Sequence, residues 1–506
     1  MTLAAVQRRG PDAGGDLPAG WCWERLDQAC ETQSGGTPSR GRPEYYGGAI
    51  PWAKIADLTH AGMWIRNTEE HITEEGLANS SAWVFPARTV LLAMYASIGT
   101  TSIAAVPLAT NQAIIGCQCS DKLLPEFLWY WFTSQKHELF SLGRGGTQAN
   151  LNAGIVKALP IPFPPLAEQH RIVAALEAAF RRLDAVAERL ARVPVVIKQF
   201  RAAVLSAAVE GRLTEDWRAD HADRVEPASA LLERILAERR TRWETEQREK
   251  YARSGKTPPF NWQAKYEGPA APHTEGLPEL PDRWCWAKVD QVVQFGRYGS
   301  STKASEDNGG VPVLRMGNIQ NGELDLMNLK YLPAEHSEFP GLLLELGDIL
   351  FNRTNSPELV GKSAVYKGRP GPCSYASYLI ALRMTGACLP DYLCSFINSS
   401  YGRAWIASVV SQQVGQANVS GSKLLALAFP LPPSAEQQEI VGRVEEQMRL
   451  ADAVEARVAQ ARERVDRLRQ ALLAKAFRGE LVPRDPNGEP VEALSDAAAG
   501  HTLAAG

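Results

Sequence analysis

The stretch PFPPLAEQHRIV, from Pro162 to Val173, has a second copy far along the chain, PLPPSAEQQEIV from Pro430 to Val441. Proline interrupts the hydrogen bonding of a strand and is tolerated in the first turn of a helix. The acidic residue of A-E-Q suits the positive N-terminus of a helix. Each copy therefore predicts the same junction, at which an extended segment stops and a helix begins.

Further similarities accompany the two junctions. LPAGWCWERLDQ (17–28) matches LPDRWCWAKVDQ (280–291), and GTQANLN (146–152) echoes VGQANVS (414–420). A repeat of this length indicates a duplicated domain pair, not a solenoid. The chain has 506 residues, which is too long for one ordinary core and agrees with several domains.

A long helix is predicted after each junction, because apolar residues recur in alternating steps of three and four. The first stripe consists of Val173, Leu176, Phe180, Leu183, Val186, Leu190, Val193, Ile197, Phe200 and Val204. The second consists of Val441, Val444, Met448, Ala451, Val454, Val458, Ala461, Val465, Leu468 and Leu472. Both stripes share one stammer, so we expect the helices to pair with each other. Pro194 predicts a bend in the first helix, whereas Arg462 stands at the matching place in the second.

The pattern divides the chain into segments. Gly, Pro, Trp and short apolar runs before each junction predict irregular, largely β domains. The predicted segments are a disordered N-terminus at 1–16, β-rich domains at 17–165 and 280–433, long helices at 166–213 and 434–481, a helical linker at 214–279, and a disordered tail at 482–506. The linker helix from Ala230 to Tyr251 is predicted to be a solvated connection, with a partner-binding surface as the alternative.

The bulk composition excludes several classes of protein. The formal net charge is -3, from 54 Lys+Arg against 57 Asp+Glu, so nucleic-acid binding would have to rest on local sites or on a basic partner. The eight cysteines include no C-x-x-C pair and predict reduced thiols. Residues 1–17 have no apolar segment typical of a signal peptide, and the most apolar window, 89–109, is interrupted by Ser, Thr, Gly and Pro. We therefore expect a cytoplasmic protein without a membrane segment.

Motifs for catalysis are missing. VGKS at 360–363 resembles the end of a phosphate-binding loop, but Ser356 stands where that loop needs glycine. The sequence has no dinucleotide-binding loop, no H-E-x-x-H, no G-x-S-x-G and no paired metal-ligand clusters. We therefore expect a protein that is not an enzyme and binds no cofactor or metal itself.

Polar loops of the two β-rich domains carry the candidate binding residues. Arg, Asn, Ser and Thr can contact base edges or phosphates, although Asn and Gly also build ordinary turns. The segment FNRTNSPELVGKS (351–363) favours binding, because Arg353 and Lys362 flank several amides and hydroxyls. The candidate nucleic-acid contacts are Arg40, Arg42, Lys54, Asn111, Gln112, Gln148, Asn150, Ser300, Ser301, Lys303, Arg315, Asn318, Asn352, Arg353, Asn355, Ser356, Lys362, Gln416 and Asn418.

The chain resembles the specificity (S) subunits of type I restriction–modification enzymes. The resemblance extends from Leu17 to Pro483 and rests on the duplicated layout, the two W-C-W stretches, NRTNSPELVGK, LPIPFPPLAEQ, LPPSAEQ and AFRGEL. It implies an α+β fold in which two target-recognition domains are joined by a long antiparallel two-helix coiled coil, with an internal pseudo-twofold duplication.

The resemblance also implies a function. Each target-recognition domain would read one half of a split double-stranded DNA sequence, and the coiled coil would fix the gap between the halves. Two methyltransferase (M) subunits and two restriction (R) motor-nuclease subunits would bind this chain. S-adenosylmethionine, ATP and Mg would belong to those partners. The recognition domains differ in sequence, so the two half-sites should differ.

Three alternatives remain open at this point. The chain could be a self-contained DNA methyltransferase or restriction enzyme, which methyl transfer by the purified chain would indicate. It could be a DNA-binding defence component outside restriction, which neighbouring genes would reveal. A structural coiled-coil protein would leave the two β-rich domains unexplained.

Overall fold

The computed structural model describes residues 17–143, 150–221, 223–386, 388–413 and 416–483. The chain forms two compact units, and both unit boundaries fall inside the long helices. Unit 1 contains the chain up to Ala191 and from Ala459 onward, and unit 2 contains Arg192–Val458. The termini expected to be disordered, 1–16 and most of 482–506, lie outside the described residues.

Unit 1 is built on two sheets and a short ribbon. The five-stranded sheet has the order β2–β10–β7–β8–β4, with bounds Cys30–Ser34, Ile114–Cys119, Val90–Ala93, Thr101–Ala104 and Trp64–Ile65. The four-stranded sheet has the order β5–β3–β9–β6, with bounds Glu70–Ile72, Tyr46–Ala53, Leu108–Thr110 and Val84–Phe85. The short elements around them are α2 (Leu26–Ala29), η1 (Pro43–Tyr45), α3 (Ile55–Ala61), α4 (Glu74–Ala78), α5 (Pro125–Ser134), α6 (Lys136–Gly143) and α7 (Ala153–Lys157).

Unit 2 contains more and shorter sheets. Its largest has the order β13–β22–β18–β20, with bounds Val293–Tyr298, Leu379–Met384, Ile349–Asn352 and Ser363–Val365. The smaller sheets are β17–β14–β21 (Lys330–Leu332, Val311–Leu314, Ser374–Tyr375), β19–β24–β23 (Thr354–Asn355, Gln416–Asn418, Ser411–Gln413) and β15–β16 (Ile319–Gln320, Glu323–Leu324). The short helices are α11 (Val289–Val292), η4 (Met316–Asn318), α12 (Pro390–Asn398), α13 (Ser400–Val409) and α14 (Gly421–Leu425).

The last two residues of each W-C-W stretch begin a strand that pairs with the strand leading into a long helix. β1 (Cys22–Arg25) is antiparallel to β11 (Pro160–Phe163), and β12 (Cys285–Lys288) is antiparallel to β25 (Ala428–Leu431). The first strand of each β-rich domain is thereby hydrogen-bonded to its last strand. The two quoted motifs are therefore neighbours in the fold of both repeats.

The glutamine of A-E-Q fixes the start of each helix, a role that the sequence reasoning missed. Gln169 Oε1 accepts a hydrogen bond from Leu124 N at 2.8 Å, and Gln437 Oε1 accepts one from Leu389 N at 2.9 Å. Their amide nitrogens donate to Pro164 O and Pro432 O, each at 2.9 Å. Because both glutamines are fully buried, these bonds satisfy polar groups that would otherwise be costly.

The two long helices are α8 (Leu166–Val209) and α15 (Ser434–Phe477), of 44 residues each. At ~1.5 Å per residue each is about 66 Å long. Gly211 and Gly479 follow the two ends with φ of 73° and 68°, a left-handed conformation that glycine adopts without strain. The helices end four residues before the predicted limits of 213 and 481, because these terminating turns are not α-helical.

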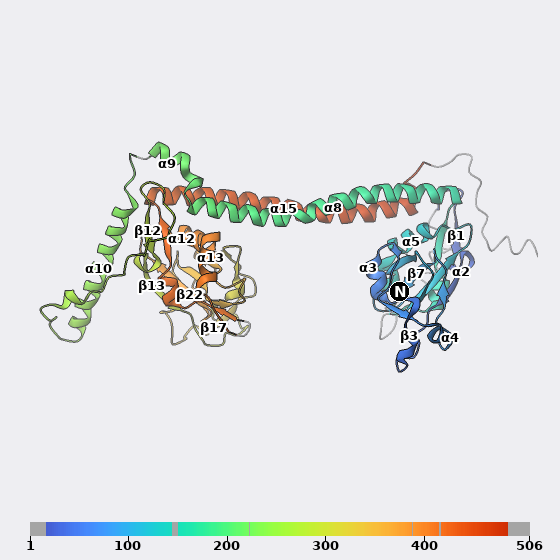
Figure 1. The fold of residues 1–506 in the computed structure, drawn as a ribbon, viewed down its shortest axis with the longest axis horizontal. Coiled ribbons are helices and arrows are strands. Elements are labelled where there is room, and N and C mark those ends of the chain that lie inside the picture. The colour runs from blue at the N-terminus through green and yellow to red at the C-terminus, as the bar shows by residue number, and fades with distance from the viewer. Residues whose placement is uncertain (1–16, 144–149, 222, 387, 414–415, 484–506) are drawn as a thin grey trace, which may run out of the picture. The chain divides into compact units, whose positions relative to one another are not determined.

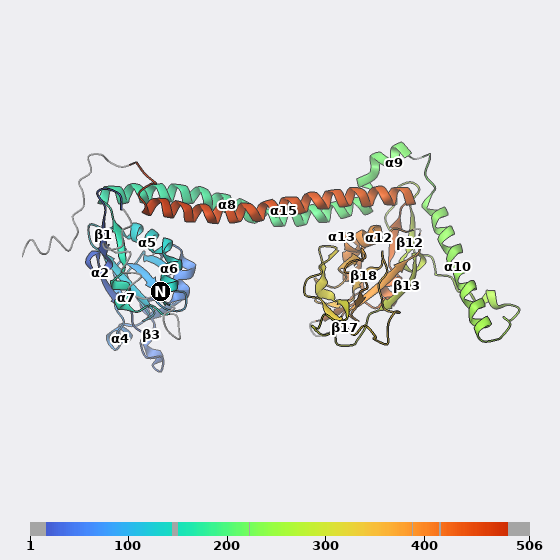
Figure 2. The same ribbon diagram turned by 180° about the vertical axis from the view of Figure 1, so that it is seen from behind.

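The helices pair antiparallel, as expected. In unit 1, Arg469 contacts Asp184 and Arg462 contacts Leu190, so residue numbers rise along α8 as they fall along α15. In unit 2, Arg201 Nη2 lies 2.6 Å from Asp452 Oδ1 and 3.0 Å from Glu455 Oε2. In both units α8 and α15 lie side by side (Figures 1 and 2).

The predicted apolar stripes are shielded from solvent except at two positions. Val186 is 43% exposed and Leu468 is 44% exposed, whereas Ile197 and Val465 are buried. Two helices cover only a narrow stripe of each other, so a residue displaced from it remains in solvent. Helical structure continues through Pro194, and the bend expected there stays a prediction.

The end of α15 belongs to the core of unit 1. The ring of Phe477 contacts the rings of Phe127 and Trp131, with centroids 5.3 Å and 5.0 Å apart. Leu473 is also buried against this core. Burying one such side chain stabilises the fold by roughly 1.5–3 kcal/mol, so the α15 terminus is firmly held.

The linker lies within unit 2. It contains η2 (Arg212–Thr214), α9 (Glu215–His221), α10 (Ala228–Arg253) and η3 (Trp262–Lys265). Leu231 and Ile235 of α10 are buried, and Arg239 Nη1 donates to Val293 O at 2.7 Å. The linker helix is therefore not a fully solvated connection, because one of its faces packs on the β domain (Figure 1). Among the described residues, no helix combines the length and the apolar character that crossing a membrane requires.

Candidate nucleic-acid interface

Unit 2 brings Arg353 and Asn418 together from distant parts of the chain. β19 pairs with β24 so that Thr354 faces Asn418, and Arg353 Nη2 donates to Asn418 Oδ1 at 3.2 Å. The guanidinium of Arg353 lies over the ring of Tyr298, 4.8 Å from its centroid. Two of the candidates from the sequence thus meet beside an aromatic ring.

The backbone around Arg353 is fixed by neighbouring strands. Arg353 N donates to Tyr378 O at 3.0 Å, and Val419 N donates to Arg353 O at 2.9 Å. Within the described part of the chain, no carboxylate lies within 4.0 Å of this guanidinium, whose Nε has no partner. An arginine with a fixed backbone and an uncompensated charge can bind a phosphate or a base edge.

Two tyrosines at this place were missed by the sequence reasoning. Tyr298 is 44% exposed and Tyr378 is 46% exposed, and both lie next to Arg353 in the contacts above. Tyr298 OH accepts a hydrogen bond from Gly421 N at 2.8 Å, which fixes its ring. Tyr298 lies in GRYGSSTK (296–303), of which only Ser300, Ser301 and Lys303 were candidates from the sequence.

Two of the candidate asparagines are used inside the fold. Asn318 is buried; its Oδ1 accepts from Arg315 N at 2.9 Å and its Nδ2 donates to Asp325 O at 2.8 Å. Asn352 is fully buried, and its Nδ2 donates to Leu359 O at 3.2 Å. Both therefore hold loops in place, as asparagines in ordinary turns do.

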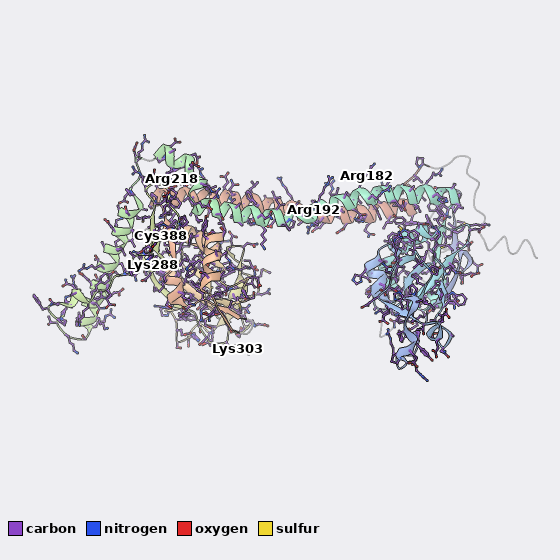
Figure 3. All side chains as sticks on the ribbon, in the orientation of Figure 1. Arg182, Arg192, Arg218, Lys288, Lys303 and Cys388 are labelled. Carbon is purple, nitrogen blue, oxygen red and sulfur yellow. The ribbon has the colours of Figure 1, made fainter. Side chains whose placement is uncertain are left out.

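The remaining candidates of unit 2 are distributed around these loops. Ser300 is buried and bonded to Glu338, whereas Ser301 and Lys303 are exposed. Lys303 lies on the side of unit 2 away from α8 and α15 (Figure 3).

Arg315 Nη2 donates to Asn328 O at 2.7 Å, and Asn355 Oδ1 accepts from Ser356 N at 2.8 Å. Lys362 is half-buried. Gln416 opens β24, and its side chain lies outside the description.

The candidate cations of unit 1 are already paired. Glu70 accepts from Arg40 Nη1 at 2.7 Å and from Lys54 Nζ at 2.7 Å, and Lys54 also lies 2.9 Å from Glu69. The hydrogen bond from Arg40, followed by that from Lys54, lowers the pKa of Glu70. Arg42 pairs with Glu44 at 3.2 Å. Each of these three cations is thus paired with a carboxylate, unlike Arg353.

The amides of unit 1 are partly engaged within the fold. Gln112 Oε1 accepts a hydrogen bond from Thr37, and Asn111 Oδ1 accepts from Ala113 N at 3.1 Å. Asn150 is exposed. Gln148 lies outside the described residues.

The chemistry available at these loops is hydrogen bonding and charge pairing. Within the described ranges, no group of three or more His, Cys, Asp or Glu could hold a metal ion. Burial raises the pKa of the Cys388 thiol to about 12 and that of Cys394 to about 12, so both stay protonated at neutral pH. The polar and aromatic groups of the described loops are arginines, amides, hydroxyls and tyrosine rings.

Comparisons with known proteins agree with this chemistry. The family model of the type I restriction modification DNA specificity domain matches residues 18–194 and 281–458. The EcoKI specificity subunit of Escherichia coli (strain K12) is 31% identical over 368 residues, which cover 72% of this chain and 67% of that protein. The EcoBI specificity subunit of Escherichia coli is 25% identical over 465 residues, covering 89% and 84%.

Solved structures share the fold. A chain from a study of complex assembly and conformational transition of the type I restriction–modification system has a TM-score of 0.64 at 20% identity, covering 92% of this chain and 99% of that one. The HsdS subunit of Thermoanaerobacter tengcongensis has a TM-score of 0.53 at 19% identity, covering 93% and 99%.

The fold is thus that of two duplicated domains joined by a coiled coil, and each domain matches the model of a DNA specificity domain. The chain belongs to the specificity subunits of type I restriction–modification systems. These subunits are the non-catalytic members of their systems and need no cofactor of their own.

Proposed function

We propose that each β-rich domain reads one half of a bipartite DNA target and that α8 and α15 together set the distance between the halves. The proposal rests above all on Arg353, whose guanidinium is held over Tyr298 and has no described carboxylate partner. A positive group with fixed backbone, flanked by exposed aromatic rings, suits base-edge or phosphate contact.

The two halves of the target are proposed to differ. The candidate cations of unit 1 form pairs with Glu44, Glu69 and Glu70, whereas Arg353 of unit 2 pairs with the neutral amide of Asn418. Groups so differently arranged present different donors and acceptors to a base pair. We include the exposed candidates Asn150, Ser301 and Lys303 as further DNA contacts, whereas Asn318 and Asn352 support the loops.

Partner subunits complete the proposed function. We infer that methyltransferase subunits dock on this chain and that restriction subunits join them, with S-adenosylmethionine, ATP and Mg bound by those partners. The net charge of -3 supports this division, because the chain itself lacks the positive surplus expected of a protein that binds DNA alone. A cytoplasmic location follows from the same proposal.

Genome-wide mapping of methyladenine tests the proposal. The chain is deleted and then restored in cells that keep its methyltransferase partner, and every methylated motif is compared. A split motif that disappears and returns is the expected result, and it would reveal both half-sites together. Unchanged methylation in cells where the methyltransferase is active would contradict the proposal and favour a DNA-binding defence protein outside restriction.

A further inference from the structure

The two domain–helix junctions share one packing arrangement, in which a glycine contacts a proline and a tryptophan. Gly211 in unit 2 packs against Pro281 and Trp284, and a Cβ on it would lie 3.2 Å from Trp284 Cζ2. Gly479 in unit 1 packs in the same way on Pro18 and Trp21, with 3.6 Å to Trp21 Cζ2. The glutamate of A-E-Q belongs to each junction as well, as Glu436 in unit 2 and as Glu168 in unit 1.

In unit 2 the carboxylate of Glu436 is surrounded by hydrogen-bond donors. Glu436 is buried; its Oε2 accepts from Trp284 Nε1 at 2.8 Å, and its Oε1 accepts from Thr214 Oγ1 at 2.8 Å. Arg218 Nε donates to the same Oε1 at 2.9 Å, and its guanidinium lies 5.6 Å from the centroid of the Trp284 ring. Arg218 lies beside the start of α15 (Figure 3).

In unit 1 the corresponding atoms lack these donors. Glu168 is only 7% exposed, yet its Oε1 has no hydrogen-bond partner, and Trp21 Nε1 is also buried without one. The sequence G-R-L-T at 211–214 aligns with G-E-L-V at 479–482, so Val482 stands where unit 2 has Thr214. Val482 packs against the core of unit 1 and has no hydroxyl to donate.

A buried carboxylate oxygen without a partner is unfavourable, because it has lost its hydrogen bonds to water and has no hydrogen bond or ion pair in their place. The same fold solves this problem in unit 2 with a guanidinium, which offers several N–H donors and stacks on the neighbouring indole. We propose that the buried carboxylate of Glu168 receives the guanidinium of an arginine.

The arginine has two possible sources. One is Arg484, the first basic residue after Val482 in the sequence. The other is an arginine of a methyltransferase subunit bound to this chain, and this second source rests on the function proposed above. Either source would supply a guanidinium to Glu168. In the first case Glu168 binds an arginine in the isolated chain, and in the second case it does so only when the methyltransferase subunit is bound.

Glu168→Gln is the variant that tests the site, because glutamine keeps the shape and removes the charge that attracts a guanidinium. It is compared with the full-length chain, with Arg484→Ala, and with the double variant. Glu436→Gln is the matched control in unit 2, where loss of stability is expected whatever fills unit 1. The unfolding midpoint of each chain and its dissociation constant with the methyltransferase subunit are measured.

If the chain supplies its own arginine, Glu168→Gln and Arg484→Ala each lower the unfolding midpoint, and the double variant loses no more than either alone. If the partner supplies it, both leave the midpoint unchanged and Glu168→Gln weakens methyltransferase binding at least tenfold. The proposal is overturned if Glu168→Gln changes neither quantity, or if it lowers the midpoint independently of Arg484→Ala without affecting binding. Should the unmodified chain bind no methyltransferase, the proposed function fails, and the midpoints alone decide the site.

Discussion

Arg462 of α15 donates a hydrogen bond from Nη2 to the backbone carbonyl of Leu190 in α8, at 3.0 Å. Leu190 stands four positions before Pro194, so its carbonyl would normally accept from the N–H of residue 194. Proline has no N–H, and the bond within the helix is missing. Arg462 occupies the position of the second repeat that matches Pro194, and it replaces the donor that the proline removed.

Arg462→Ala should therefore lower the free energy of unfolding by about 1–2 kcal/mol, because the Leu190 carbonyl then loses its donor. In a Pro194→Ala background the same change should cost much less, since the introduced alanine supplies its own N–H. Urea unfolding of the two single variants and the double variant measures the coupling. Arg457→Ala is the control, because Arg457 is an exposed arginine of the same helix. Equal losses from Arg462→Ala in both backgrounds would contradict the compensation.

Arg353→Ala should weaken binding to one half-site by ~1–3 kcal/mol and leave the other half-site unaffected. The physical reason is the loss of a guanidinium that no described carboxylate neutralises. Binding is measured with DNA duplexes in which one half-site or the other is scrambled. Arg369→Ala, at an exposed arginine of the same unit, is the matched control and should bind as the unmodified chain does. Equal binding of Arg353→Ala and the unmodified chain to both half-sites would contradict the assignment of Arg353 as a DNA contact.

Local sequence signals predicted the junctions and the helix pair, because proline chemistry and apolar periodicity act over a few residues. The interface depended on contacts between distant segments. Nothing near Arg353 in the sequence indicates that Asn418 lies beside it, and nothing near Arg40 indicates that Glu70 pairs with it. An asparagine in a loop can read a base or hold a turn. Only the fold shows that Asn318 and Asn352 hold turns.

Glu70→Gln should reduce the loss of stability that unit 1 shows as the pH falls into the acidic range. Hydrogen bonds from Arg40 and Lys54 lower the pKa of Glu70, so the unfolded chain binds its proton at higher pH than the folded chain does. The stabilisation from these pairs is present above the ordinary glutamate pKa of about 4.5 and is lost as the pH falls below it. Because the pairs are near the surface, each contributes less than about 1 kcal/mol.

Unfolding midpoints measured from about pH 3 to about pH 7, a range that spans the ordinary pKa of glutamate, follow this effect. The unmodified chain should lose stability toward acid more steeply than Glu70→Gln does. Glu75→Gln is the control, since Glu75 is an exposed glutamate of the same unit. A steeper acid loss in Glu70→Gln than in the unmodified chain would contradict the expected sign.

Val465→Asp should disrupt the helix pair, because Val465 is buried between α8 and α15 and an unpaired carboxylate there costs several kcal/mol. Leu468→Asp is the matched control: it introduces the same charge three residues later, where the side chain is 44% exposed, and should change stability by less than about 1 kcal/mol. Circular dichroism during heating measures both. Combined with Val458→Asp, the disrupted pair should also lose the fixed distance between half-sites in methyladenine maps. A strict, unchanged spacing in that variant would show that the coiled coil does not set the distance.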